Sequence, residues 1–535
     1  MASKTMGGGD TFRRREKELD VRRSNILAAR AVADVIRTSL GPKGMDKMIK
    51  GDDGSVLITN DGATILQKLK VVHPAAKMMQ QLSRAQDVEA GDGTTSVVVI
   101  AGALLAACEQ LLNKGIHASV IVDAFVLAST KAEQVLESVG IPVRLDDREG
   151  LIQACTTALS SKVVSQESGA LPAIAVDAVL RVWDKADDAH NVDINDRIRV
   201  AERLGGTIDD TEIVDGLIFK QGLAGSGTAA TDQVRRVENA KIALIQFHLS
   251  APKTDMENQV VVKDYGQMDR VLTEERRYIM QMCKKIKQSG CTVLLVQKSI
   301  LRDATNELSL HFLSKMGVLV VADVERADVE FVCRTVGCKP VAHVDAMSPG
   351  DLGSARVVEE VEGDEDRKMV RVTGVPNPGR TVSILVRGSN KLVLAEAARS
   401  LHDALCVVRS IVKRRFLIVG GGAPEAELAL RLSQFALTLT GQESFCVKAF
   451  ADALEVVPYT LAENAGLPPL EVVTELRRLH AEGKATTGVD VKRGGVADLA
   501  GTGVVQPLLV SSSAVALAAE TVRLVLKIDD IVATR

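Results

Sequence analysis

The segment that most constrains this chain is Gly91–Ser96, which reads Gly-Asp-Gly-Thr-Thr-Ser and leads directly into the apolar run Val97–Ile100. Glycines let a backbone pass close to a ligand, and the N–H groups and hydroxyls at a helix start bind phosphate. Asp92 stands between the two glycines, and a carboxylate tolerates phosphate beside it only when a cation such as Mg²⁺ separates the charges. The alternative is an ordinary glycine-rich turn with a threonine helix cap. The predicted phosphate ligands are Gly93, Thr94, Thr95 and Ser96.

Length and composition exclude several function classes. A chain of 535 residues is too long for one hydrophobic core, so we expect roughly two to four domains. Aromatic residues make up only 3%, too few for a platform that stacks nucleic-acid bases. The net charge of −3 provides no general attraction to DNA or to an anionic membrane. We therefore expect no nucleic-acid partner, no membrane association and no membrane-spanning segment.

The eight cysteines are scattered along the chain. The closest pair, Cys333 and Cys338, has the spacing Cys-x4-Cys, and no second pair completes a zinc site. We interpret the cysteines as core residues of a protein in a reducing compartment, the cytoplasm.

The hydrophobic pattern changes twice along the chain. The first ~145 residues read as mainly helical, the region after Val234 as alternating strands and helices, and the region after Phe416 as helical again. A chain that leaves one domain and returns to it has this order. The polar stretch Ser250–Asp269 is either a surface loop or an excursion that presents apolar residues to a partner.

Individual elements can also be predicted. Ser24 is expected to cap a helix that stops at Gly41-Pro42, after a mobile polar arm over residues 1–23. The alternating residues Leu524–Val532 predict a strand with a free edge, able to pair with a neighbouring subunit. Further helices are expected at 74–90, 94–114 and 390–409, and strands at 55–59, 242–247, 292–296, 318–322 and 381–387.

Acids and glycines supply the candidate catalytic groups. No Gly-x4-Gly-Lys-Ser/Thr sequence is present, so this is not a P-loop protein. Asp61 lies in a tight turn and Asp403 in a helical pattern, and one carboxylate could orient a water for attack on a γ-phosphate while another holds Mg²⁺. The alternatives are a turn-forming residue for Asp61 and a surface acid for Asp403. Gly420–Gly422 indicates close backbone approach, to a ligand or to another helix, and Lys162 is a possible phosphate contact.

Several long segments occur together in one order: Thr38–Asp46, Thr59–Ile65, Gly91–Ser96, Arg399–Ala404 and Gly420–Glu425. This set resembles the group II chaperonins and covers essentially the whole chain. A second set is similar to one subunit type of the eukaryotic cytosolic chaperonin (CCT, or TRiC). Its members are Gln246–Asn258, Val296–Asp303, Gly388–Lys391, Ala449–Ala453, Val504–Val510 and Lys527–Arg535.

The resemblance implies a multidomain α and α/β fold with three domains. A mainly helical equatorial domain would comprise residues 1–147 and 413–535, an intermediate domain 148–215 and 381–412, and an α/β apical domain 216–380. A helical protrusion near residues 250–282 would form a lid. Such subunits form two stacked rings of eight subunits each. In this type of chaperonin the chain would have seven paralogous partner subunits. They hydrolyse ATP with Mg²⁺ to close the lid over clients such as actin and tubulin.

The resemblance also implies roles for single residues. Leu40, Gly41 and Pro42 would border the nucleotide, Asp92 would hold Mg²⁺, and Gly93 to Ser96 the phosphates. Asp403 would activate water with Asp61 assisting. Ser160, Ser161 and Lys162 would touch the phosphate end, Gly421 and Gly422 the ribose, and Asp490 and Gln506 the ribose and base. Ser160 and Asp490 depart from the family pattern, in which asparagine is common at both positions.

Two other functions compete with an ATP-driven folding subunit. One is a scaffold subunit of the same ring that binds nucleotide with little turnover, and the presence of both aspartates argues against it. The other is a soluble phosphotransferase, against which the lid-like excursion argues.

Overall fold

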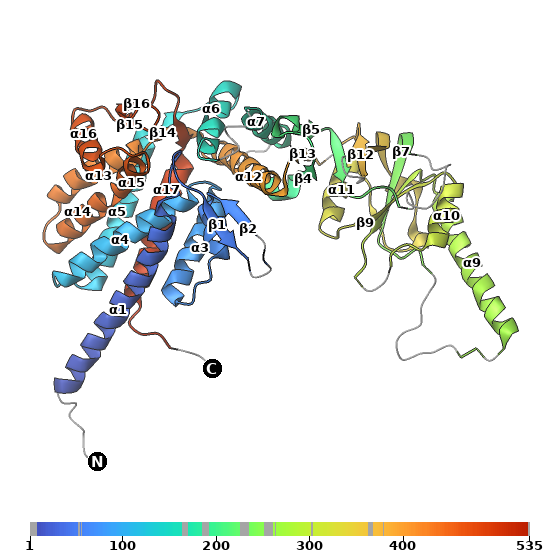
Figure 1. Cartoon of the computed structure of the whole chain (residues 1–535), viewed down its shortest axis with the longest axis horizontal. Coiled ribbons are helices and arrows are strands. Elements are labelled where there is room, and N and C mark those ends of the chain that lie inside the picture. The colour runs from blue at the N-terminus through green and yellow to red at the C-terminus, as the bar shows by residue number, and fades with distance from the viewer. Residues whose placement is uncertain are drawn as a thin grey trace, which may run out of the picture. The chain divides into compact units, whose positions relative to one another are not determined.

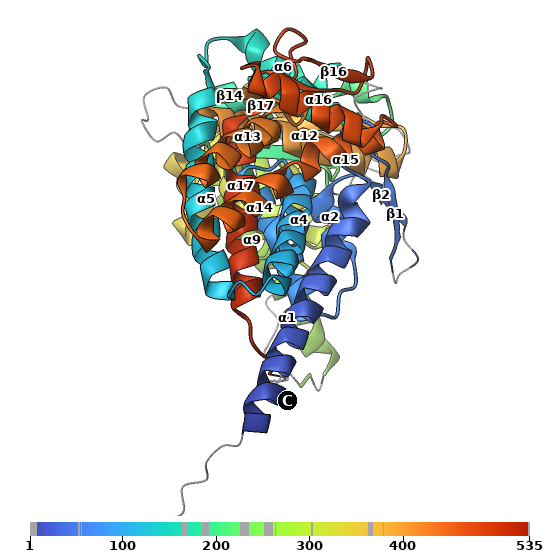
Figure 2. The ribbon, with the colours of Figure 1, turned by 90° about the vertical axis from the view of Figure 1, so that its left-hand side faces the viewer.

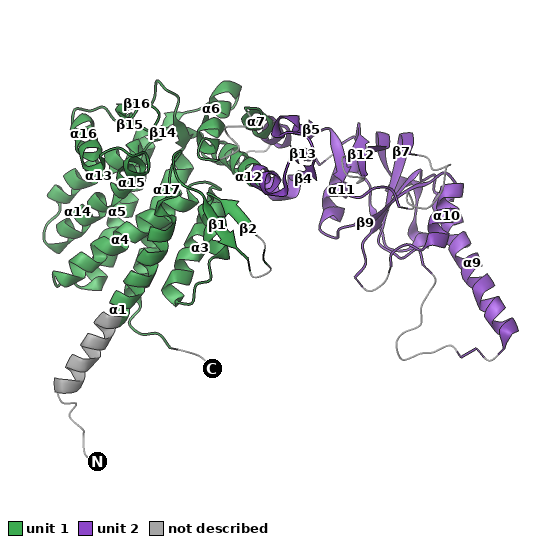
Figure 3. Ribbon diagram, viewed as in Figure 1, with its two compact units in different colours: residues 1–176, 189–191, 399–535 green, residues 177–188, 192–398 purple. Residues whose placement is uncertain are grey.

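The computed structural model describes residues 8–51, 54, 56–162, 169–183, 192–224, 235–250, 261–262, 264–300, 303–361, 368–377 and 379–532. The chain forms two compact units, coloured separately in Figure 3. The first contains residues 1–176, 189–191 and 399–535, and the second contains residues 177–188 and 192–398. Both ends of the chain therefore belong to the first unit. The division into three domains stays a prediction.

The first unit is mainly helical (Figure 1). Its helices are α1 (Gly8–Arg37), α2 (Gly62–Lys68), α3 (Pro74–Glu89), α4 (Thr94–Asn113), α5 (Ala118–Val139), α6 (Arg148–Leu159), α13 (Ala423–Thr438), α14 (Gln442–Leu454), α15 (Val456–Asn464), α16 (Pro469–Ala481) and α17 (Leu508–Lys527). Two further helices, α7 (Leu171–Val182) and α12 (Lys391–Lys413), have residues in both units.

The core of this unit lies among α4, α5, α14 and α17, which pack side by side (Figure 2). A helix that is apolar on all sides is stable only when buried, and the consecutive residues Val97–Ala101 at the start of α4 are all buried. Phe125 of α5 and Phe450 of α14 meet edge to face with 5.1 Å between ring centroids. Burying one such side chain contributes about 1.5–3 kcal/mol to folding.

Short strands position the loops of the first unit. They are β1 (Lys47–Lys50), β2 (Val56–Thr59), β3 (Ile141–Pro142), β14 (Phe416–Val419), β15 (Thr487–Asp490), β16 (Gly495–Asp498) and β17 (Val505–Pro507). β14 lies between β17 and β3, antiparallel to both, while β1–β2 and β15–β16 form antiparallel pairs. β14 therefore places Gly420–Gly422 beside β17.

The second unit contains a seven-stranded sheet in the order β6-β12-β11-β7-β8-β9, with β10 paired to β7. β7, β8 and β9 are parallel neighbours joined through helices, which confirms the predicted α/β arrangement. The elements of this sheet and its helices are β6 (Gly216–Phe219), β7 (Arg236–Ile245), α9 (Tyr265–Gln288), β8 (Val293–Gln297), α10 (Glu307–Lys315), β9 (Leu319–Val324), α11 (Asp328–Val336), β10 (Pro340–Val341), β11 (Gly353–Val361) and β12 (Met369–Thr373).

A second sheet of the same unit has the order β4-β13-β5 and follows the short helix α8 (Ile194–Arg197). Its strands are β4 (Ile198–Leu204), β5 (Glu212–Val214) and β13 (Val382–Gly388). Of the protrusion expected near residues 250–282, residues 251–260 and 263 lie outside the described residues, and α9 forms part of the remainder.

The predicted beginning of the first helix is wrong. α1 begins at Gly8, so Ser24 lies inside the helix and residues 8–23 are not an arm without regular structure. The charged run Arg13–Lys17 consists of arginine, glutamate and lysine, which have high helix propensity and can pair at helical spacing. The helix ends at Arg37, and Gly41, with φ +87°, turns the chain just beyond it.

The predicted C-terminal strand is also wrong. α17 continues to Lys527, and residues 528–532 have no regular structure. Within that helix Leu524 is exposed, whereas Val525 and Leu526 are buried, as expected for a helical face rather than a strand. The proposed pairing of this segment with a neighbouring subunit therefore loses its basis.

Two helices of the described chain, α4 and α17, are long and apolar enough to cross a membrane by length and composition alone. Most of each helix is buried in the first unit, and buried core helices commonly meet the same test.

Candidate functional site

A cavity of about 560 Å³ in the first unit is lined by segments that lie far apart in the sequence. Its volume is within the range of ligand-binding pockets. Every residue that the sequence analysis assigned to a site lines this cavity, and the roles of these residues remain predictions. They are Leu40, Gly41, Pro42, Asp61, Asp92, Gly93, Thr94, Thr95, Ser96, Ser160, Ser161, Lys162, Asp403, Gly421, Gly422, Asp490 and Gln506.

A larger groove of about 800 Å³ lies among α1, α4, α14, α15 and α16. None of the predicted site residues lines it, so we place the candidate site in the smaller cavity.

The start of α4 provides one wall of the cavity. Gly93 is its N-cap residue and has φ +75°, a conformation that glycine adopts without strain. Because glycine has no side chain, the N-cap does not occupy the N–H groups of the first helical turn. Thr94, Thr95 and Ser96 therefore bring N–H groups and hydroxyls to the cavity. This arrangement suits an anion such as phosphate.

Asp61 has a structural role as well as a place in the cavity. It is the N-cap of α2, where its side chain accepts hydrogen bonds from the backbone N–H groups of Ala63 and Thr64. The hydroxyl of Thr64 donates to Oδ2 of Asp61 at 2.6 Å, and the hydroxyl of Thr94 donates to Oδ1 at 3.1 Å. The turn-forming alternative is thus realised, here as a helix cap, and the same carboxylate joins the starts of α2 and α4.

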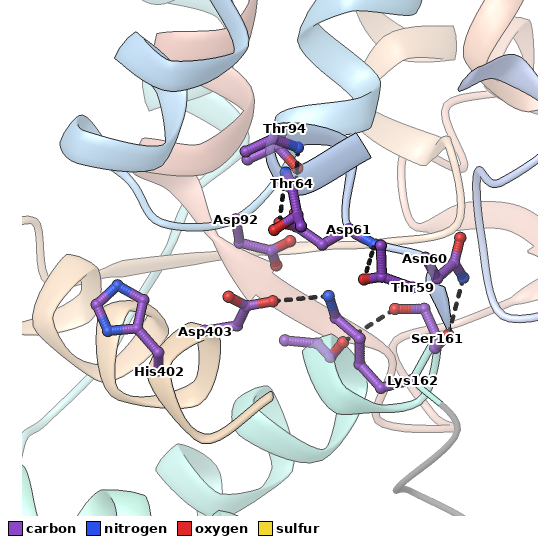
Figure 4. A network of polar contacts seen from close by, with 12 residues as sticks. Thr59, Asn60, Asp61, Thr64, Asp92, Thr94, Ser161, Lys162, His402 and Asp403 are labelled. Atoms are coloured by element: carbon purple, nitrogen blue, oxygen red, sulfur yellow. Dashed lines mark hydrogen bonds and ion pairs between the residues drawn. The ribbon is translucent and has the colours of Figure 1, made fainter. Parts of the chain in front are cut away.

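A buried ion pair faces these groups (Figure 4). Lys162, three residues after α6, places its Nζ atom 2.8 Å from Oδ2 of Asp403 on α12. The Lys162 and Asp403 side chains are only 8% and 16% exposed. Figure 4 shows the carboxyl groups of Asp92 and Asp403 pointing toward each other, while His402 points away. Asp92 accepts a hydrogen bond from the Gly93 N–H at 2.6 Å.

The shared burial of three acids beside Lys162 changes the pKa values of these acids. Burial raises the pKa of Asp403 to about 7, with Lys162 opposing the rise and Asp61 and Asp92 adding to it. Burial also raises the pKa of Asp92, against the Gly93 hydrogen bond and Lys162. For Asp61, burial is outweighed by Lys162 and by the hydrogen bonds from Thr64 and Thr94, which together lower its pKa. The cluster therefore holds a carboxyl that changes its protonation near neutral pH beside one that stays ionised.

Replacing Lys162 with methionine is expected to move the protonation of Asp403 to higher pH. An opposite charge at this distance typically lowers a carboxyl pKa by about 1–3 units, and the substitution removes that effect. The measurement is the pH profile of single-turnover hydrolysis of ATP, the substrate that the resemblance implies, and its midpoint should rise by about 1–3 units. Loss of a phosphate contact alone would change affinity and leave the midpoint in place, so an unchanged midpoint contradicts the prediction.

Gln86 on α3 holds the loop that carries Asp92, a role that the sequence analysis missed. Its fully buried side chain donates from Nε2 to the carbonyl oxygens of Asp92 at 2.9 Å and Val510 at 3.3 Å. Its Oε1 accepts a hydrogen bond from the Ser513 hydroxyl at 3.0 Å. Every polar atom of this amide therefore has a partner, and the loop is tied to α17.

Gln86→Met is expected to weaken Mg-ATP binding by about 10–100-fold, the usual effect of removing a group that orients a metal ligand. It leaves carbonyl groups without their donor, which costs about 1–3 kcal/mol each when buried. Gln80→Met is the matched control, because Gln80 also lies on α3 and donates to two carbonyls, those of Leu66 and Leu69. Equal losses of ATP affinity in both variants, measured by calorimetry, would show that Gln86 has no special role in the loop.

The three consecutive glycines approach other backbone segments. A Cβ atom on Gly421 would lie 2.3 Å from Leu499, and one on Gly422 would lie 2.9 Å from Pro458. Gly421 also accepts a backbone hydrogen bond from Val489 at 2.9 Å. The close approach predicted for this run is therefore to β15 and to α15, and the same glycines line the cavity.

Further polar residues from the C-terminal part of the chain line the cavity. Asp490 accepts the backbone N–H groups of Lys492 and Arg493, and Gln506 donates to the Ser511 hydroxyl at 2.8 Å. Glu425, which the sequence analysis did not assign, lines the cavity as well, and burial raises its pKa. Its sequence signal was its place at the end of the segment Gly420–Glu425, three residues after Gly422, the N-cap of α13.

No three His, Cys, Asp or Glu side chains converge as a metal-binding group in the parts of the chain that the structure describes. Mg²⁺ in nucleotide sites is commonly held by one or two carboxylates together with phosphate oxygens and water. The donor set fits such an ion, because the Asp92 carboxyl lines the cavity. With Asp61 and Asp403, the cluster has three acids and one lysine, Lys162.

The amino-acid sequence matches the TCP-1/cpn60 chaperonin family over residues 32–535. The chain is 58% identical to T-complex protein 1 subunit delta of Rattus norvegicus over 528 residues, which cover 99% of this chain and 96% of the rat protein. It is 58% identical to the Dictyostelium discoideum protein of the same name over 533 residues, covering 100% and 98% of the two chains. Identity to the Arabidopsis thaliana protein of that name is 55% over 536 residues, covering 100% and 99%.

The delta subunit is also the subunit type that the second set of sequence segments resembles, so this resemblance is confirmed. The mixed α and α/β architecture agrees with the same assignment. Since the family match extends over nearly the whole chain and the relatives are more than half identical, the chain belongs to the TCP-1/cpn60 chaperonin family.

Proposed function

We propose that this chain binds and hydrolyses ATP as one subunit of a hetero-oligomeric chaperonin. The observation that best supports the proposal is the cavity, where the start of α4 and a buried acid–lysine cluster line the same space. A helix start favours an anion, and clustered acids favour a cation. ATP with bound Mg²⁺ provides both the anion, its phosphate chain, and the cation.

Each group has a role that its chemistry suits. The N–H groups of Thr94, Thr95 and Ser96, with the hydroxyls of Thr95 and Ser96, bind the phosphate chain, and Lys162 lies at its end. Asp92 holds Mg²⁺, which when bound supplies positive charge to the phosphate oxygens. Asp403 accepts a hydrogen bond from the attacking water and orients it.

Asp61 assists by holding Thr94, since four hydrogen bonds already reach its carboxylate. The nucleoside end is bordered by the remaining predicted residues. These are Leu40, Gly41, Pro42, Gly421, Gly422, Asp490 and Gln506, while Ser160 and Ser161 lie at the phosphate end with Lys162.

The relatives are subunits by name, which supports an assembly with other chaperonin subunits. We extend the proposal to a double ring with seven paralogous partners in the cytoplasm. Its lid, formed near residues 250–282, closes over unfolded clients such as actin and tubulin as ATP is hydrolysed. The equatorial, intermediate and apical domains expected from the sequence belong to this proposal.

A scaffold subunit that binds nucleotide with little turnover is the alternative. It needs the phosphate site but not a carboxyl that ionises near neutral pH. The pKa of Asp403, raised by burial to about 7, favours turnover because a group that accepts protons works best near the operating pH.

The test uses the intact complex that contains this chain. Photolabelling with 8-azido-ATP, followed by peptide mapping, should mark cavity peptides of this chain only with Mg²⁺ present. ATP should compete with the label, and AMP, which lacks the terminal phosphates, should compete poorly. Native mass spectrometry with and without ATP should show this chain together with its partner subunits. Labelling outside the cavity, or equal competition by AMP, would contradict the proposal.

A further inference from the structure

Two cysteines in the second unit face each other at the end of α11. The Sγ atoms of Cys333 and Cys338 lie 3.9 Å apart, and both residues are free thiols. Among the described residues no second pair of metal ligands accompanies these cysteines, so they do not complete a zinc site. Two thiol sulfurs in contact are, however, placed for disulfide formation.

The local fold explains the contact. α11 ends at Val336, and Gly337 follows with φ +76°, which reverses the chain and which glycine adopts without strain. The Gly337 N–H donates to the Cys333 carbonyl at 2.9 Å, so Cys338 folds back onto the turn that carries Cys333. That turn is anchored on its other side, where the carbonyls of Arg334 and Thr335 accept backbone N–H groups of a neighbouring loop. Both sulfurs are therefore held in place before any reaction.

The two thiols are not equivalent. Cys333 is partly exposed, whereas the other seven cysteines, including Cys338, are buried. The Cys338 thiol donates to the Cys333 sulfur, which lowers the pKa of Cys333 against burial and the nearby charge of Glu330. The same contact, with burial, raises the pKa of Cys338. Elsewhere burial raises the pKa of Cys155 to about 12, which keeps that thiol unreactive.

We propose that Cys333 and Cys338 form a dithiol modification site that a hydroperoxide converts into a disulfide. The Cys333 sulfur attacks one peroxide oxygen, the O–O bond breaks, and a sulfenic acid forms as the other oxygen leaves and is protonated to water (or to an alcohol). The Cys338 sulfur then attacks the Cys333 sulfur. The S–S bond forms, the S–O bond breaks, and the hydroxide leaves with the Cys338 proton as water. The two sulfurs together lose two electrons, which the peroxide gains.

The geometry requires little movement. A disulfide needs the sulfurs to approach from 3.9 Å to about 2.05 Å, which side-chain rotation within one helix turn can supply. In a reducing compartment such a bond is transient, as expected for a redox-sensing pair rather than a structural cross-link. Cys338 also protects Cys333, because disulfide formation competes with irreversible oxidation beyond the sulfenic acid.

The test treats the full-length chain in its complex with hydrogen peroxide, blocks free thiols by alkylation and digests with trypsin. Cleavage after Arg334 separates the two cysteines into the peptides 327–334 and 335–356. Wild-type protein should yield these peptides linked, two hydrogens lighter than their sum, and dithiothreitol should separate them. Cys155 and Cys291 should remain fully alkylatable after unfolding.

The matched variants are Cys338→Ser and Cys333→Ser. In Cys338→Ser, the sulfenic-acid reagent dimedone should label Cys333 several-fold more strongly than in wild type, and in Cys333→Ser no linked peptide should form. Unlinked wild-type peptides, with dimedone labelling as strong as in Cys338→Ser, would overturn the proposal. So would a Cys333 that stays unmodified. The wild-type measurement stands by itself if a variant fails to fold.

Discussion

Asp403→Asn is expected to slow single-turnover ATP hydrolysis at this subunit's site by about 10²–10⁴-fold, with ATP affinity changed little. That range is the usual contribution of a positioned acid or base. The substitution keeps the shape of the side chain and its contact with Lys162, and it removes the carboxylate that we propose orients water and accepts its proton. Binding should persist because the start of α4 and Asp92 remain.

The pH dependence provides a second readout for Asp403. Burial raises its pKa to about 7, so the carboxyl is mostly neutral below that pH and ionised above it. In the proposed mechanism the ionised form is the active one, so kcat/KM for hydrolysis should rise with pH through about 7 in the wild type, because this ratio reports the free protein. This rise should be absent from Asp403→Asn. A rise centred near the ordinary aspartate range would show that another group limits the reaction.

His402→Asn is the matched control for Asp403→Asn. His402 precedes Asp403 on α12, and its ring points away from the acid cluster in Figure 4. This variant should hydrolyse ATP like the wild type. The other subunits must carry inactive sites, so that the assay reports this subunit alone. If Asp403→Asn hydrolyses at the wild-type rate, the nucleotide-binding scaffold becomes the better description.

Asp92→Asn is expected to lower the affinity for Mg-ATP by about 10²–10³-fold. Two unit charges 4 Å apart interact by about 4 kcal/mol at an effective dielectric constant of 20, and a part of that attraction is lost with the carboxylate. The effect on metal-free ATP should have the opposite sign. Without Mg²⁺, the Asp92 carboxylate repels the phosphates, so the variant should bind ATP more tightly than the wild type in the presence of a chelator.

The reversal of sign separates a metal ligand from a structural residue. Damage to the loop, whose Gly93 N–H is held by Asp92, would weaken binding both with and without Mg²⁺. Asp123→Asn, which removes an exposed acid of α5 outside the cavity, controls for net charge and should change neither affinity. Calorimetric titrations with Mg-ATP and with ATP plus chelator give the two affinities of the wild type and of each variant. A uniform loss would assign Asp92 to loop structure alone.

The sequence predicted well where neighbouring residues decide the structure. The glycine before Thr94 and the apolar run after it specify where α4 begins, and the structure places that helix within one residue of the prediction. At Asp61 the turn-forming interpretation is realised as a helix cap, and the same residue lines the cavity, while its catalytic role stays a prediction. Prediction failed at both ends of the chain. At the C-terminus, an apolar pattern that alternates over a few residues also fits a helix. At the N-terminus, a run of mixed charges, which we interpreted as a solvated arm, can also belong to a helix.

By itself, the sequence determined local features of this protein: the glycine-capped start of α4, the parallel strands β7, β8 and β9, and the residue types that line the cavity. Only the tertiary structure decided that Lys162 pairs with Asp403, that Gln86 holds the Asp92 loop, and that the Cys338 sulfur meets Cys333. The ion pair and the amide contacts join segments that pack together only through the shared core, and no local pattern records that packing. The burial created by the same packing removes water from these groups, and it raises the pKa of Asp403 to about 7.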